Sequence, residues 1–143
     1  DVRNFGAIAR TCECAGVDAI VIPERGSVSI NADAVKTSAG ALLHIPVARV
    51  RNLNETIKQL KNSGMSIVGV TEKGSSDYTK ANLQLPTALI MGAEDTGISA
   101  ENLRECDFFA AIPMYGKINS LNVSVAAGIM IYEVIRQRNS DIL

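Results

Sequence analysis

The sequence has little of what would mark a disulfide-stabilised or metal-binding protein. It contains no tryptophan, a single histidine and only three cysteines, Cys12, Cys14 and Cys106. An odd number of cysteines argues against a disulfide framework, and the pair at 12 and 14 has no second ligand pair at metal-site spacing. We therefore expect reduced thiols in a cytoplasmic protein, and no zinc or other metal site.

Charge of one sign and long apolar runs are also lacking. Fourteen basic and fifteen acidic side chains give a net charge of -1, so any contact with RNA must come from a local patch. No apolar run is long enough to span a membrane, and the start has no signal-peptide pattern, so we expect no membrane partner. The chain opens at Asp1, without Met and already inside a helical pattern, which fits a fragment of a longer protein.

What is present is an alternation of helical and strand-like segments. Helical spacing of apolar residues, with capping residues and glycines at the ends, predicts helices over 5–15, 31–43, 52–63, 99–106 and 121–138. Short apolar runs predict strands over 18–23, 46–50, 66–70, 87–92 and 108–113. This order predicts an α/β fold, a mostly parallel sheet with helices on both faces. With 47% hydrophobic residues, the chain is expected to form a single domain over 1–143.

Three of the predicted strands end in unusual sequences. Thr71 and Glu72 directly follow the strand at 66–70, the strand at 87–92 runs into a loop from Gly92 to Gly97, and the last strand runs into a polar stretch around Ser120. Ligands of parallel sheets bind beyond such carboxyl ends. The glycine loop is neither a phosphate loop nor a dinucleotide fingerprint, so a structural turn and a ligand loop both remain open.

Three segments resemble the motifs of one enzyme family. Asn4–Gly16 (NFGAIARTCECAG), Leu89–Ser99 (LIMGAEDTGIS) and Ile112–Arg136 (IPMYGKINSLNVSVAAGIMIYEVIR) are similar, in the same order, to the motifs of the SpoU/TrmH RNA ribose 2′-O-methyltransferases of the SPOUT superfamily. The resemblance implies an α/β fold with a C-terminal trefoil knot, an S-adenosylmethionine pocket, no metal, and a homodimer. The expected dimer agrees with a last helix that is apolar on more than one side, with Val125, Ala126, Ile129, Met130, Tyr132 and Ile135.

The resemblance also implies roles for particular residues. The catalytic candidates are Arg10, Asn4, Glu94, Ser120 and Asn122. The residues that match or border cofactor-binding positions are Thr71, Met91, Gly92, Ala93, Ile112, Met114 and Leu121. Each catalytic candidate has a simpler structural alternative: Arg10 as a solvated side chain, Glu94 as a cap of the glycine loop, Asn122 as the cap of the last helix. Tyr115, His44 and the cysteines are interpreted as structural.

The sequence also departs from the family's pattern. Arg3 stands where the family often has His, and Asp95 and Thr96 follow Glu94 in place of the usual pattern. A first strand and an N-terminal RNA-binding domain are expected to be absent. The resemblance implies methylation of a ribose 2′-hydroxyl in structured RNA, with rRNA favoured over tRNA as substrate. An inactive RNA-binding homologue is the alternative, and the missing glycine fingerprint disfavours a nicotinamide-dependent oxidoreductase.

Overall fold

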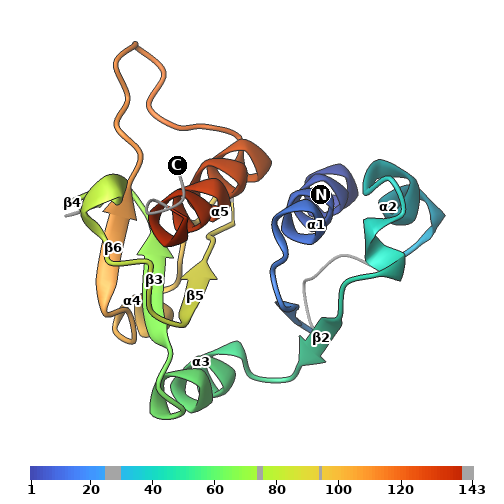
Figure 1. Ribbon diagram of the computed structural model, residues 1–143, viewed down its shortest axis with the longest axis horizontal. Helices are drawn as coiled ribbons and strands as arrows, with labels where there is room; N and C mark the ends of the chain where they lie inside the picture. The colour runs from blue at the N-terminus through green and yellow to red at the C-terminus, as the bar shows by residue number, and fades with distance from the viewer. Residues whose placement is uncertain (25–29, 74–75, 94, 140–143) are drawn as a thin grey trace. The chain divides into compact units, whose positions relative to one another are not determined.

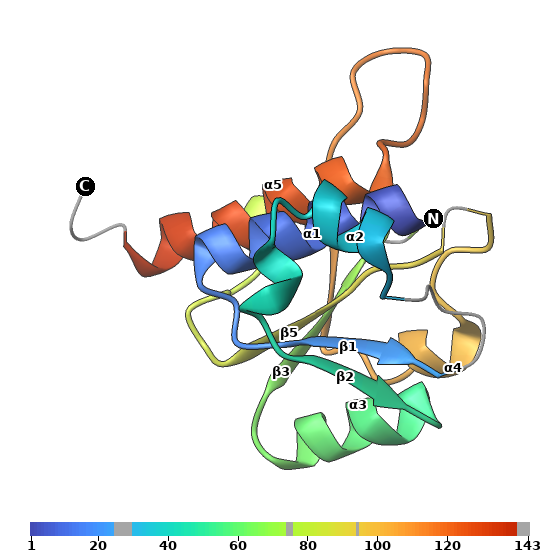
Figure 2. The same ribbon diagram turned by 90° about the vertical axis from the view of Figure 1, so that its right-hand side faces the viewer.

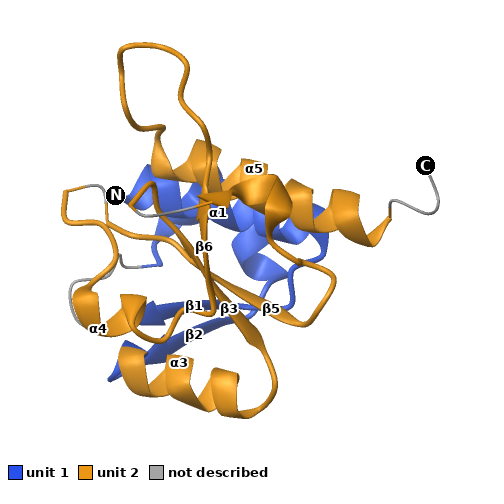
Figure 3. Cartoon of the chain, turned by 90° about the vertical axis from the view of Figure 1, so that its left-hand side faces the viewer, with its two compact units in different colours: residues 1–53 blue, residues 54–143 orange. Residues whose placement is uncertain are grey.

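The computed structural model describes residues 1–24, 30–73, 76–93 and 95–139. The chain divides into two compact units, residues 1–53 and 54–143, coloured separately in Figure 3. Within the described residues every pairing of one strand with another is parallel, and each unit holds one sheet. The α/β fold with parallel strands is thus confirmed.

The first unit opens with helix α1 (Val2–Ala15). The Asp1 carboxylate accepts hydrogen bonds from the backbone N–H groups of Arg3 (2.7 Å) and Asn4 (3.3 Å), which stabilises the first turn. The helix ends at Gly16, whose φ of 76° lies in the left-handed region. The predicted stop at this glycine is confirmed, because glycine adopts that conformation without steric cost.

The remainder of the first unit pairs two short strands. Strand β1 (Ile20–Pro23) runs parallel to β2 (Val47–Val50), and α2 (Ala32–Thr37) lies between them in sequence. The helix predicted over 31–43 had Gly40 either inside it or at its end, and in the structure α2 already ends at Thr37, before that glycine. The chain instead takes a left-handed turn at Gly40 (φ 83°) and continues as a 3-10 turn, η1 (Ala41–Leu43).

The second unit is built on a four-stranded parallel sheet with the order β4-β6-β3-β5. Its strands are β3 (Ser66–Val70), β4 (Ser76–Asp77), β5 (Thr87–Ile90) and β6 (Phe108–Ala111). Three of them were predicted. Strand β4 and the 3-10 turn η2 (Tyr78–Lys80) were not, because two residues carry no detectable periodicity.

Helices cover both faces of this sheet. Figures 1 and 2 show α5 (Val123–Arg138) on one face and α3 (Leu53–Asn62) and α4 (Ala100–Leu103) on the other. On the α5 side, Met130 packs with Val68 and Ala110 in the buried core. On the opposite side, the amide of Asn54 in α3 donates a buried hydrogen bond of 3.0 Å to Asn102 in α4. The predicted helix over 99–106 is shorter in the structure, since only four residues are helical.

The carboxyl end of α5 is fastened to the segment before β5. The Gln137 side chain accepts from the Leu83 backbone N–H (2.8 Å) and donates to the Ala81 carbonyl (2.9 Å). Beside it, the buried Glu133 accepts two hydrogen bonds from Arg136, of 2.7 and 2.8 Å. These bonds lower the pKa of the Glu133 carboxyl. The last helix is therefore fixed in place at the end far from the loop that precedes it.

Candidate functional site

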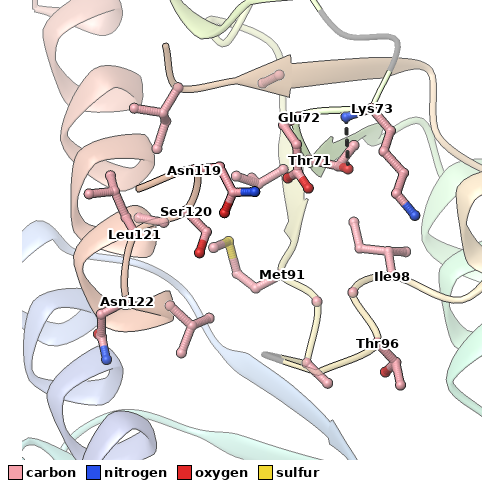
Figure 4. Close-up of a pocket in the computed structure, with 18 of the residues that line it drawn as sticks. Thr71, Glu72, Lys73, Met91, Thr96, Ile98, Asn119, Ser120, Leu121 and Asn122 are labelled. Carbon is pink, nitrogen blue, oxygen red and sulfur yellow. Dashed lines mark hydrogen bonds between the residues drawn. The ribbon is translucent and has the colours of Figure 1, made fainter. Parts of the chain in front are cut away.

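A pocket opens at the carboxyl ends of β3, β5 and β6, inside the second unit (Figure 4). Its volume is about 590 Å³, within the range of small-molecule sites. The walls come from the segment after β3, the loop after β5, the end of β6 and the loop before α5. The sequence had singled out these three strand ends, and the structure brings them together around one cavity.

All the residues that the resemblance connected with the cofactor line this pocket. They are Thr71, Met91, Gly92, Ala93, Ile112, Met114 and Leu121. Two of the catalytic candidates, Ser120 and Asn122, line it as well. Residues from four separate segments of the sequence therefore converge on one site.

The loop after β5 is shaped by its own glycines. Gly97 has a φ of 69°, and its backbone N–H donates a 2.8 Å hydrogen bond to the Ala93 carbonyl. A Cβ added to Gly92 would lie 2.5 Å from the Gly97 carbonyl carbon and 2.6 Å from the Ile98 nitrogen. Glycine at 92 is thus required by the close approach of the two arms of the loop. The structural interpretation of the glycines is correct, and the same fold of the loop presents its backbone to the pocket.

The segment after β3 forms a polar wall of the pocket. The Thr71 backbone N–H donates a 3.0 Å hydrogen bond to the Ala110 carbonyl, which continues the pairing of β3 with β6. The Thr71 hydroxyl accepts a 3.3 Å hydrogen bond from the backbone N–H of Lys73, drawn as a dashed line in Figure 4. Thr71 is thereby held at the end of the strand, and the segment that follows is directed along the cavity.

The loop before α5 ends in a helix cap. The Asn122 side-chain oxygen accepts from the backbone N–H groups of Ser124 (2.9 Å) and Val125 (3.4 Å), and from the Ser124 hydroxyl. The alternative structural interpretation of Asn122 therefore holds. Because the cap fixes the start of α5, it also fixes Leu121 and Ser120, which precede it and line the pocket. Figure 4 shows Ser120 directed towards Met91.

The other catalytic candidates are not among the described residues that line this pocket. Asn4 and Arg10 lie on α1 in the first unit, where Arg10 is exposed and Asn4 is half-buried. Glu94 lies outside the described residues. The structure thus places two of the five candidates at the pocket.

The residues interpreted as structural show no feature of a catalytic side chain. Burial raises the pKa of the Cys12 thiol to about 11, so this cysteine is a poor nucleophile. Tyr115 is 94% exposed on the loop between β6 and α5. Within the part of the chain that the structure describes, no cluster of His, Cys, Asp or Glu could hold a metal ion. In the same residues, no helix combines the length and apolarity that a bilayer crossing demands.

Sequence reasoning missed several pocket residues. Lys73, Thr96, Ile98 and Asn119 also line the cavity, as does Glu72, which the sequence placed at a strand end without a role. Each is a neighbour of a residue already selected or part of the glycine loop, and proximity to a strand end was the available signal. The pocket is lined by both apolar and polar side chains, a composition suited to a ligand that has both an aromatic and a polar part.

Comparison with known proteins agrees with this architecture. Residues 1–132 match the model of the SpoU rRNA Methylase family. A relative from Staphylococcus saprophyticus, assigned to the TrmH family of tRNA/rRNA methyltransferases, is 46% identical over 97% of this chain and 56% of its own length. The chain therefore spans little more than half the length of that relative.

Solved structures show the same relationship. The SpoU methyltransferase AviRb from Streptomyces viridochromogenes, in complex with AdoMet, superposes with a TM-score of 0.90 at 30% identity and covers 98% of this chain and 57% of its own. The TrmH/SpoU tRNA modifying enzyme of A. aeolicus has a TM-score of 0.90 at 35% identity and covers 99% of this chain and 72% of its own. The fold is that of the SPOUT methyltransferases. The chain belongs to the SpoU rRNA methylase family.

Proposed function

We propose that this chain is the S-adenosylmethionine-dependent part of an RNA methyltransferase that modifies a ribose 2′-hydroxyl. The observation that carries the proposal is the pocket at the ends of β3, β5 and β6, which is lined by every residue expected to bind the cofactor. Support also comes from the AdoMet bound to the similar enzyme AviRb. When bound, S-adenosylmethionine supplies a methyl group carried on a positively charged sulfur.

The chemistry of the pocket side chains suits such a donor. The positive charge of a sulfonium is lost during methyl transfer, so a strongly anionic environment would stabilise the ground state more than the transition state. Ser120 and Asn122 are neutral, and the tight loop at Gly92 brings Gly92, Ala93 and Gly97 to the cavity, which have no polar side chain. The task left to these residues is to hold donor and acceptor in line, and positioning supplies much of the acceleration.

Arg10 and Asn4 are proposed to serve the RNA side of the reaction. A guanidinium is effectively always protonated in proteins, so Arg10 is a poor general base. Its exposed side chain is suited to binding the phosphate next to the target ribose and to stabilising the negative charge that develops on the 2′-oxygen. Glu94 is proposed to act at the same centre, and the 2′-proton leaves to solvent.

We also propose that residues 1–143 form one domain and that the protein is a homodimer. The family model spans both compact units, which supports one methyltransferase domain over 1–143 with a C-terminal trefoil knot. Val125 and Tyr132 on α5 are 50% and 49% exposed, and Ile118 on the preceding loop is 80% exposed. Apolar side chains exposed over one helix favour a homodimer. Light scattering at micromolar concentration is expected to give twice the chain mass, and a monomer would contradict the dimer.

The substrate is proposed to be rRNA, with tRNA as the alternative. The decisive experiment maps 2′-O-methylated nucleotides in rRNA and tRNA from a strain that lacks the gene, and compares them with the parent strain. We expect one ribose methylation to disappear and to return with the wild-type gene. If every 2′-O-methylation persists in the deletion strain, the enzymatic function is wrong, and an inactive RNA-binding homologue takes its place.

A further inference from the structure

Glu72 is the pocket residue whose chemistry the proposed function has not used. It follows Thr71 at the end of β3 and lines the cavity. Among the described residues, no hydrogen bond or ion pair engages its carboxylate, nor the side chain of Asn119 on the facing loop. Figure 4 shows the carboxylate of Glu72 and the amide of Asn119 pointing towards each other. Two polar side chains thus enter one cavity with their hydrogen-bonding capacity open to a ligand.

The chemistry of a carboxylate narrows what it can bind. An ionised carboxylate only accepts hydrogen bonds, and its two oxygens match a pair of adjacent hydroxyl donors. In dinucleotide-binding folds an acidic side chain beyond a strand binds ribose hydroxyls in this way. None of the residues that match or border cofactor-binding positions carries a carboxylate, so the ribose hydroxyls of the cofactor have no such partner among them.

An alternative target for Glu72 is the sulfonium, and the reaction argues against it. A carboxylate close to the positive sulfur would stabilise the donor before transfer and would raise the barrier as that charge is lost. A ribose diol is neutral before and after transfer, so a carboxylate that binds it strengthens binding without this penalty. Hydrogen bonds to charged acceptors are the stronger kind, which makes such a contact effective even at a partly open site.

We infer that Glu72, assisted by Asn119, binds the ribose hydroxyls of the cofactor's adenosine and so selects a ribonucleoside donor. This inference rests on the proposed function, because it assigns a residue to the cofactor of the same pocket. Glu72 is a binding residue on this account and takes no part in moving the proton.

The test measures binding and does not depend on turnover. Isothermal titration calorimetry of the full chain measures the dissociation constants of S-adenosylhomocysteine, which lacks the sulfonium, and of its 2′-deoxy and 3′-deoxy analogues. We expect Glu72→Gln to weaken S-adenosylhomocysteine about tenfold, as for the loss of one charge-assisted hydrogen bond. We also expect the variant to lose most of the wild-type discrimination against at least one deoxy analogue, because the hydroxyl and the carboxylate form one contact.

Glu101→Gln is the matched control, since it removes the same charge at an exposed position of α4 that does not line the pocket. It is expected to change affinity by no more than about twofold and to keep full discrimination against the deoxy analogues. The inference is overturned if Glu72→Gln binds as the wild type does, if both variants weaken binding equally, or if Glu72→Gln discriminates against the deoxy analogues as the wild type does.

The outcomes also separate this inference from the proposed function. If the wild type binds S-adenosylhomocysteine and Glu72→Gln binds it with the same affinity, only the role of Glu72 is wrong. If the wild type binds neither S-adenosylmethionine nor S-adenosylhomocysteine, both the role of Glu72 and the proposed function are wrong. Circular dichroism of each variant, expected to match the wild type because Glu72 is exposed, ensures that a loss of binding is not a loss of fold.

Discussion

The two compact units of this chain differ in how much of a site each one carries. The second unit has a four-stranded sheet and a complete pocket at the ends of three adjacent strands. The first unit has two four-residue strands, and it holds Arg10 on an exposed helix face. On the proposed function, one unit binds the methyl donor and the other supplies the group that acts on the RNA.

Replacing Arg10 is expected to have the largest effect on activity and to separate the roles of the two units most clearly. Arg10→Ala should lower methyl transfer to RNA at least about 100-fold, the loss typical of removing a group that stabilises developing charge. Because Arg10 does not line the pocket proposed for the donor, the dissociation constant for S-adenosylmethionine should stay within about twofold. Radiolabelled methyl transfer and calorimetry measure the two quantities.

Arg10→Lys is the control that keeps the positive charge. A guanidinium binds a phosphate through two parallel hydrogen bonds and lysine does not, so this variant should also be strongly impaired. Near-normal turnover of Arg10→Lys would contradict a specific role for the guanidinium.

Gly92→Ala is expected to have the next largest effect, this time on the donor side. The added methyl group would lie 2.5 Å from the backbone of Gly97, so the loop must move. We expect the dissociation constant for S-adenosylmethionine to rise more than about tenfold and stability to fall by about 1–3 kcal/mol. Gly116→Ala is the control, since nothing lies within 4 Å of a Cβ there. Equal behaviour of both variants would show that the loop at Gly92 is not part of the donor site.

Glu133→Gln is expected to destabilise the second unit by roughly 1–2 kcal/mol near neutral pH. The folded chain lowers the pKa of Glu133 below its ordinary value of 4.5, so the ionised form is favoured on folding. Its contribution to stability is fully present above pH 4.5 and is lost as the pH falls through the folded pKa. The variant should therefore lose less stability than the wild type on acidification.

Urea unfolding measured from about pH 6 down to about pH 3 tests this prediction, since the Glu133 carboxyl titrates in the acidic range. Glu101→Gln, at an exposed position of α4, is the matched control and should follow the wild type. An identical pH dependence of Glu133→Gln and the wild type would show that the Glu133–Arg136 pair does not stabilise the fold.

Asn122→Asp is expected to have the smallest effect on stability and separates two roles of one side chain. Aspartate keeps the oxygen that accepts from Ser124 and Val125, so the free energy of unfolding should stay within about 0.5 kcal/mol of the wild type. Turnover should still fall if the Asn122 amide donates to the substrate as proposed, because aspartate lacks that donor. Unchanged turnover would leave Asn122 with capping alone. Asn122→Ala, which removes the cap, should cost about 1 kcal/mol.

The same contrast between units explains what the sequence could predict. Local signals were sufficient for the stops at Gly16 and Gly64, both of which have positive φ, and for the apolar runs that became β3, β5 and β6. The convergence of three strand ends followed from one general property of parallel sheets. These features belong mostly to the second unit, where the motifs are dense.

Features that depend on long-range packing were not predictable. The shortening of α2 depends on how Gly40 turns the chain, and the two-residue β4 exists only because β6 lies beside it. The steric requirement at Gly92 arises between residues that the sequence could only describe as a loop. Asn119 was missed, and Glu72 was noted at a strand end without a role, because a ligand as partner leaves no periodic pattern in the chain.

Hydrogen exchange measured by mass spectrometry, with and without S-adenosylmethionine, tests the central claim most directly. We expect the cofactor to protect backbone amides at the strand ends of the second unit, in peptides covering 66–73, 87–93 and 108–123. Peptides from residues 1–53 should show the smaller change. Protection concentrated in residues 1–53, with the three strand ends unchanged, would contradict the assignment of the donor site.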